Sequence, residues 1–171
     1  MIYILPDFFS NIECEKYIEL INNNKIIVPF TNSGKFNNNK WNDTELTSLF
    51  YEKLLTYKID DNLLRPNKIV MSGKYDVGDS FSLHTDTGLF YDKINKEKTC
   101  WTLLIYLNDN YTGGETVFYD NNFNISKIIK LKKGNAILFD IDLWHKGNEL
   151  ISGKKYWIGC EIIGKFKECL L

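Results

Sequence analysis

The chain has 171 residues, a length typical of one domain with a sizeable core. Its composition is that of a globular protein, with 44% hydrophobic and 25% charged residues. The formal net charge of -1 argues against a protein that holds nucleic acid by bulk charge, although a local basic patch stays possible in principle. We therefore expect a single domain, 1–171, and no nucleic-acid partner.

The cysteines and the first residues of the chain indicate where in the cell the protein is expected. Cys14, Cys100, Cys160 and Cys169 form no C-x-x-C pair, which favours reduced, intracellular thiols. No stretch approaches the roughly 20 apolar residues of a membrane span. The segment Met1–Pro6 lacks a basic flank and resembles a strand more than a signal peptide. We expect a cytoplasmic or otherwise intracellular protein without a membrane partner; the sequence predicts no oligomeric state.

The first third of the chain predicts two helices. Ser10 and Glu13 form a capping box that starts a helix running to about Asn22, with an apolar face of Ile12, Tyr17, Ile18 and Ile21. The segment Thr31–Trp41, rich in Asn, Gly and Lys, predicts a loop. Asp43 then caps a second helix, whose apolar stripe consists of Leu46, Leu49, Phe50, Leu54 and Tyr57.

From Lys68 onward the pattern changes to short β-branched and aromatic runs separated by turn residues. The predicted strands are Ile69–Tyr75, Ser80–His84, Cys100–Leu107, Thr116–Tyr119, Ile125–Ile129, Ala136–Asp140 and Tyr156–Ile163. Helices followed by many short strands predict an α+β, mainly β fold. We expect a double-stranded β-helix, or jelly roll, over about 67–165, with the helices of about 1–66 packed on one face.

The two histidines of the chain are candidate metal ligands. His84 and Asp86 are spaced i, i+2 at a strand end, so both side chains can point to one face. His145 would arrive from a later strand. Two imidazoles and one carboxylate form the facial triad of non-haem iron(II) sites. A lone H-x-D is weak evidence, and the alternative is an accidental neighbouring pair.

The residues around these histidines form five ordered blocks. The blocks are Tyr75-x-x-Gly78-x-x-Phe81-x-x-His84-x-Asp86, Thr102–Asn108, Gly113-Gly114-Glu115-Thr116-x-Phe118, Lys133-Gly134-x-Ala136-x-Leu138-Phe139, and His145-x-Gly147 with Gly153-x-Lys155. In order and spacing the sequence resembles the catalytic domain of the prolyl 4-hydroxylases, within the iron(II)- and 2-oxoglutarate-dependent oxygenases. The resemblance covers about residues 70–163.

The resemblance implies a role for each matching residue. His84, Asp86 and His145 match the iron ligands. Lys155 matches the base that pairs the C5 carboxylate of 2-oxoglutarate, and a buried dianion needs such a partner. Lys154 and Lys155 alternate faces on a strand, so only one can point inward. Tyr75, Tyr106 and Thr116 match further 2-oxoglutarate ligands; their alternative role is ordinary core packing.

The implied chemistry is hydroxylation of a C–H bond with conversion of 2-oxoglutarate and O2 to succinate and CO2. The implied cofactors are Fe(II), 2-oxoglutarate as co-substrate, O2, and ascorbate as reductant. The chemistry belongs to the cofactor, so no catalytic residue beyond the metal centre is expected. The implied partner is a peptide or protein that contains proline.

Several alternatives stay open at this stage. A related hydroxylase of a small molecule or of another residue type would share every motif. Nucleic-acid dealkylases of the superfamily usually carry Arg where this chain has Lys155. A non-catalytic jelly-roll module would not need three intact ligands, and a zinc hydrolase would not need Lys155.

Two segments are candidates for the substrate groove. The insert Thr87–Thr99 is either part of a lid, where specificity usually resides, or an ordinary solvated hairpin loop. The loop Thr31–Trp41 would supply the second edge of the groove. Both segments are polar enough to clamp an extended peptide.

Overall fold

The computed structural model describes residues 1–23, 34–35, 37–59, 63–88 and 90–165. A seven-stranded sheet forms the larger layer, and its paired neighbours are antiparallel. Its strands in spatial order are β1 (Ile2–Leu5), β11 (Ala136–Asp140), β7 (Glu97–Tyr106), β14 (Lys155–Lys165), β4 (Leu63–Tyr75) and β3 (Asn37–Asn42), with β6 (Tyr91–Asp92) paired to β7.

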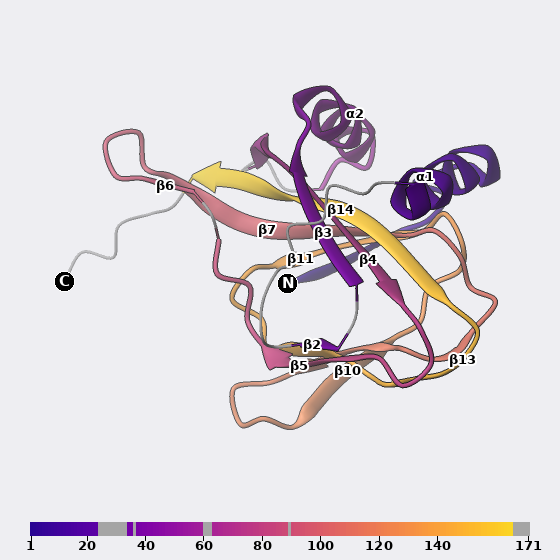
Figure 1. The fold of residues 1–171 in the computed structure, drawn as a ribbon. Coiled ribbons are helices and arrows are strands. Elements are labelled where there is room, and N and C mark those ends of the chain that lie inside the picture. Colours follow the sequence, from indigo (N-terminus) through magenta and orange to yellow (C-terminus); the bar gives the residue numbers. More distant parts are fainter. Residues whose placement is uncertain (24–33, 36, 60–62, 89, 166–171) are drawn as a thin grey trace.

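A five-stranded antiparallel sheet forms the second layer (Figure 1). Its strands in spatial order are β10 (Ile125–Ile129), β9 (Thr116–Tyr119), β12 (His145–Gly147), β5 (Ser80–His84) and β2 (Gly34–Lys35). A short ribbon pairs β13 (Leu150–Ser152) with β8 (Thr112–Gly113). The two facing sheets form the predicted mainly β jelly roll.

Both helices lie against the outer face of the larger sheet (Figure 1). Helix α1 (Asn11–Asn23) begins at the predicted capping box: the Ser10 amide donates to Glu13 Oε2 at 2.8 Å, and the Glu13 amide donates to Ser10 Oγ at 3.3 Å. Helix α2 (Thr44–Leu55) begins after Asp43, whose carboxylate accepts from the Leu46 amide at 2.9 Å. The predicted helices and caps are thus confirmed.

The predicted apolar stripes of the two helices agree less well with the residues that are buried. Cys14, Tyr17 and Ile21 are the buried residues of α1, whereas Ile12 is 83% exposed. It lies in the first turn, on the side that faces away from the sheet. In α2 the stripe also differs at its margins: Leu49 is 37% exposed and Tyr57 lies beyond the helix end.

Among the described residues, apolar side chains are buried on both sides of the larger sheet. Outside, the helices cover a layer of aliphatic and aromatic side chains that includes Phe50, Leu103 and Ile158. Inside, Phe118 of the smaller sheet meets Phe139 of the larger one, with ring centroids 5.1 Å apart. The inner side is the one that opens into the candidate site.

Four of the seven predicted strands, at 80–84, 116–119, 125–129 and 136–140, have the observed bounds. The loop prediction for Thr31–Trp41 was wrong where it can be judged, while residues 31–33 and 36 lie outside the described residues. β3, despite its run of Asn and Lys, pairs with β4 from Asn37↔Lys74 to Asn42↔Ile69. The free edge of a long neighbouring strand supplied hydrogen bonds that outweigh the poor strand propensity of Asn.

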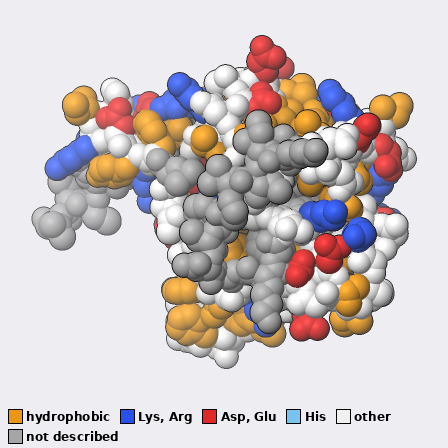
Figure 2. Space-filling model, in the orientation of Figure 1, with side chains coloured by type: hydrophobic (Ala, Val, Ile, Leu, Met, Phe, Trp, Pro, Cys, Tyr) orange, Lys and Arg blue, Asp and Glu red, His pale blue; other side chains and the backbone are white. Residues whose placement is uncertain are grey.

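Charged side chains of both signs lie on the surface of the described residues. Figure 2 shows acidic and basic side chains interspersed on the face that it displays, in keeping with the net charge of -1. Among the described residues, no helix has the length and apolar character needed to cross a membrane.

Candidate active site

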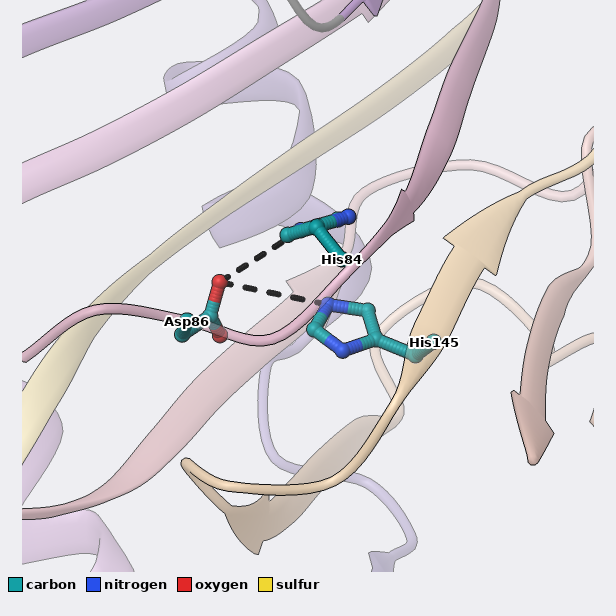
Figure 3. A group of neighbouring side chains, drawn as sticks. All are labelled: His84, Asp86 and His145. Carbon is teal, nitrogen blue, oxygen red and sulfur yellow. Dashed lines mark ion pairs between the residues drawn. The ribbon is translucent and has the colours of Figure 1, made fainter. Parts of the chain in front are cut away.

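Two neighbouring strands of the smaller sheet bring the two histidines together. His84 ends β5 and His145 begins β12, and the two residues are direct partners across the antiparallel pair. Asp86 follows β5, and its backbone amide donates to the carbonyl of Ile141 at 3.1 Å. Potential ligand atoms of the three side chains all lie within 4.8 Å of one another (Figure 3).

Each histidine ring has one nitrogen near a backbone carbonyl and the other directed at the Asp86 carboxylate. Nδ1 of His84 lies 2.7 Å from the carbonyl of Ser82, and Nδ1 of His145 lies 2.9 Å from the carbonyl of Leu143. A carbonyl only accepts, so each Nδ1 carries a proton, and Nε2 is the nitrogen of each ring that could bind a metal. The two Nε2 atoms lie 3.5 and 3.9 Å from Oδ1 of Asp86.

Burial and charge keep these groups in the forms that bind metal. Burial lowers the pKa of His145, against the opposing effect of Asp86, so its ring is neutral. Burial alone would raise the pKa of Asp86, but the neighbouring His84 and His145 and a hydrogen bond from Thr102 bring it below its ordinary value. Among the described residues, Nε2 of His84 is a buried polar atom without a hydrogen-bond partner. Two imidazoles and one carboxylate fit iron(II) with open positions.

Lys155 lies at the inner end of the same cavity. It is only 3% exposed, and its Nζ donates to the carbonyl of Gly114 at 2.7 Å. Burial lowers the pKa of Lys155 to about 7, which Glu115 partly opposes. Among the described residues no carboxylate lies within ion-pair distance of Nζ, so this end of the cavity suits a carboxylate ligand. Lys154 points outward and pairs with Asp76 at 2.5 Å.

Tyr75, Tyr106 and Thr116 surround the Lys155 ammonium group or its cavity. The Nζ atom lies 5.2 Å from the ring centre of Tyr75 and 5.0 Å from that of Tyr106, within the range of cation–π attraction. The Tyr106 hydroxyl hydrogen-bonds the Thr116 hydroxyl. Burial raises the pKa of Tyr106 to about 12 and also raises that of Tyr75. Both phenols are therefore neutral groups able to donate a hydrogen bond.

Comparison with protein-family models decides the family. Residues 70–160 match the model of the 2OG-Fe(II) oxygenase superfamily. The chain belongs to this superfamily. Its members use iron(II), 2-oxoglutarate and O2, so these three cofactors implied by the sequence are confirmed, while ascorbate stays a prediction.

Two curated relatives share part of this oxygenase sequence. An uncharacterized protein of fowlpox virus is 36% identical over 112 residues, which is 65% of this chain and 24% of the relative. A PKHD-type hydroxylase of Gloeothece citriformis is 25% identical over 114 residues, which is 66% of this chain and 51% of the relative. The chain thus spans about a quarter and about half of these two proteins.

Solved structures of other oxygenases share the fold over nearly the whole chain. The viral collagen prolyl hydroxylase of Paramecium Bursaria Chlorella virus-1, in complex with 2-oxoglutarate, has a TM-score of 0.72 at 23% identity, covering 95% of this chain and 96% of that one. A prolyl-4-hydroxylase of Pseudomonas putida has a TM-score of 0.71 at 10% identity, covering 97% and 93%. At these identities the likeness concerns the fold.

The oxygenase cavity also contains residues that the sequence did not single out. Trp157 lies two positions after Lys155 on β14, and its indole hydrogen-bonds Tyr75. A Cβ atom at Gly73 would lie 2.2 Å from Nε1 of Trp157, so glycine there makes room for the indole. The i, i+2 spacing from Lys155 was a usable signal for Trp157.

The two segments expected to border the cavity behave differently. Asn38 and Lys40, from the second half of Thr31–Trp41, line the cavity as β3 residues. In contrast, no described residue of Thr87–Thr99 lines it. That insert instead forms a β6–β7 hairpin, with Tyr91 opposite Lys98. The hairpin alternative therefore describes this insert better than a lid.

Proposed function

We propose that this oxygenase hydroxylates a C–H bond of its substrate in a reaction that consumes 2-oxoglutarate and O2, and that the substrate is a peptidyl proline. The supporting observation is that one cavity holds both the His84–Asp86–His145 group and the buried Lys155. A metal site and a carboxylate site in the same cavity are the two requirements of this chemistry.

The side chains divide between holding the metal and holding the co-substrate. Nε2 of both histidines and Oδ1 of Asp86 would hold iron(II). With 2-oxoglutarate bound, the metal supplies the oxidative chemistry that yields succinate and CO2 and hydroxylates the substrate. Lys155 would pair the far carboxylate, while the Tyr106 and Tyr75 hydroxyls would donate hydrogen bonds that fix its orientation. Phe81 and Trp157 line the cavity between these groups and limit the entry of water.

The proline substrate is supported by proteins of similar fold and by polar residues that line the cavity. Solved structures of similar fold include a collagen prolyl hydroxylase and a Trichoplax adhaerens prolyl hydroxylase in complex with a hypoxia inducible factor peptide, the latter with a TM-score of 0.64 at 14% identity. In the cavity wall, Asn38 and Lys40 of β3 supply polar groups that a peptide main chain could use.

A small-molecule substrate is the second candidate. A Streptomyces hygroscopicus protein of similar fold, with a TM-score of 0.65 at 13% identity, was solved with nickel, 2-oxoglutarate and hygromycin B bound. The same architecture therefore accommodates a compact polar ligand, and the test must include both classes.

The test is reconstitution of the apoprotein with iron(II), 2-oxoglutarate and ascorbate, followed by exposure to O2 with panels of proline peptides and of free metabolites. We expect succinate formation coupled to the gain of one oxygen on a proline peptide, detected by mass spectrometry. Asp86→Asn serves as the inactive control. Coupled turnover on a metabolite alone would replace the proline proposal with the small-molecule one, and no turnover with any metal-loaded sample would overturn the activity.

A further inference from the structure

Thr102 lies behind the candidate metal ligand Asp86. It belongs to β7 of the larger sheet, where it is 2% exposed and lines the cavity. Its hydroxyl donates to Oδ2 of Asp86 at 2.6 Å. That distance falls in the range of about 2.5–2.7 Å for a hydroxyl bound to an ionised carboxylate.

The two oxygens of Asp86 therefore have different partners. Oδ2 accepts from Thr102, whereas Oδ1 faces both imidazole rings, as Figure 3 shows. The backbone of Asp86 is held separately, because its amide donates a hydrogen bond to the carbonyl of Ile141. With main chain and Oδ2 both fixed, the carboxylate has one orientation in which a single oxygen reaches the space between the rings.

We propose that Thr102 is a positioning residue that makes Asp86 a one-oxygen ligand. The inference rests on the proposed metal site. Two imidazoles and one carboxylate oxygen occupy three of the six positions of an octahedral ion and leave three open. A carboxylate that turned both oxygens to the metal would take a fourth position, leaving too few for a two-point co-substrate and a further ligand.

The strand pairing explains why Thr102 keeps this orientation. Thr102 is paired with Phe139 of β11 on one side and with Glu161 of β14 on the other, so its backbone lies inside the sheet. A β-branched side chain in a strand has few allowed rotamers. The hydroxyl is thus presented to Asp86 by a rigid part of the molecule.

The matched control is a second buried threonine of the same strand. Thr99 is 3% exposed, and its hydroxyl accepts from the Phe90 amide at 3.2 Å and donates to Glu161 at 3.4 Å. It makes no bond to Asp86. Thr99→Val removes a hydroxyl of equal burial from β7 and leaves the ligand untouched.

The experiment titrates the apoprotein with Co(II) and follows the visible absorption bands, which report the number and kind of ligands. Thr102→Val should weaken Co(II) binding by about 10- to 100-fold, the usual effect of removing a group that orients a ligand. It should also change the band pattern. Thr102→Ser, which keeps the hydroxyl, and Thr99→Val should both retain the wild-type affinity and bands.

Thermal unfolding without metal separates positioning from folding, because Thr102→Val preserves the side-chain shape and should keep the unfolding temperature near that of Thr99→Val. If Thr102→Val does not fold, Thr102→Ala carries the same expectation for affinity and bands. Wild-type affinity and bands in the folded Thr102 variant would overturn the inference while leaving the metal site standing. A wild-type protein that binds no Co(II) would overturn both.

Discussion

The two faces of the larger sheet differ in chemistry although they share the same strands. On β14, Tyr156, Ile158 and Cys160 point outward into the helix-covered core, while Lys155 and Trp157 point into the cavity. On β7, Leu103 and Ile105 point outward, while Thr102 and Tyr106 point inward. The outer face is apolar and closed, and the inner face combines aromatic packing with polar groups directed at one space.

This difference follows from the period of a strand. Successive side chains alternate faces, so one strand can supply both a core residue and a functional residue at adjacent positions. The outer face then stabilises the fold without taking part in the chemistry. The inner face includes groups that are costly to bury, such as Lys155, which is the proposed partner of the co-substrate carboxylate.

The largest expected effect is at the metal group on the inner side. His145→Ala should abolish metal-dependent succinate formation. Its loss of metal affinity should exceed the loss of about 10- to 100-fold that is expected for residues that only orient the ligands. The outer core is untouched, so circular dichroism of the apoprotein should match the wild type. Turnover that survives in this variant would remove His145 from the ligand set.

A large effect is also expected at the other end of the cavity. Lys155→Met should raise the 2-oxoglutarate concentration needed for half-maximal turnover, because loss of one partner leaves a buried carboxylate unpaired at a cost of about 3–5 kcal/mol. Lys154→Met is the control, since that side chain lies at the surface with Asp76. If Lys154→Met had the larger effect, the assignment of faces on β14 would be wrong.

A substitution on the outer face should lower stability and leave metal binding unchanged. Phe50→Ala empties a fully buried position between α2 and the sheet, and should lower the free energy of unfolding by about 3–5 kcal/mol. Denaturant titration measures that loss. At a temperature where the variant is folded, its metal affinity should equal that of the wild type; a large loss of affinity would mean that the two faces are not independent.

A smaller effect is the pH dependence that Lys155 contributes. Burial lowers its pKa in the folded protein from 10.5 to about 7, so the unfolded chain binds more protons between these values. The stability of the cofactor-free protein should therefore rise with pH across this window, by at most about 1.4 kcal/mol per pH unit. Below about pH 7 the cost of burying the charge is fully present.

The same window should have the reverse effect on 2-oxoglutarate, which needs the protonated amine and should bind more weakly as pH rises. Lys155→Met removes the charge, so its unfolding free energy should lack the Lys155 contribution to the slope. Denaturant titrations of both proteins at several pH values compare the slopes. Equal slopes would show that Lys155 keeps an ordinary pKa.

Residues close in the sequence explain what could be predicted. The helix starts at Ser10 and Asp43 follow from a side chain and an amide three residues apart, and both caps are observed. Strand alternation predicts that only one of Lys154 and Lys155 points inward, and the family resemblance selects Lys155. The blocks around His84 and His145 pointed to the oxygenase family, which the family match confirms.

The secondary structure of the two segments expected at the groove depends on strand pairing that the sequence did not predict. Asn38 and Lys40 lie in the segment expected at the groove edge, but they reach the cavity as part of a strand, because β3 adds to the edge of β4, and nothing in an Asn-rich run predicts that partner. The hairpin at 91–98 formed where a lid was one of two options, because Tyr91 and Asp92 found partners on β7.

The sequence by itself determined the family, the two helix starts, four strands and the set of candidate ligands, because caps, alternation and motif spacing act over a few residues. Tertiary structure decided that His84 and His145 are direct strand partners, and that Thr102 donates to Asp86 from the opposite sheet. The physical reason is that antiparallel pairing sets register through hydrogen bonds between segments far apart in the chain. Only that register determines which polar side chains share the inner space and which face solvent.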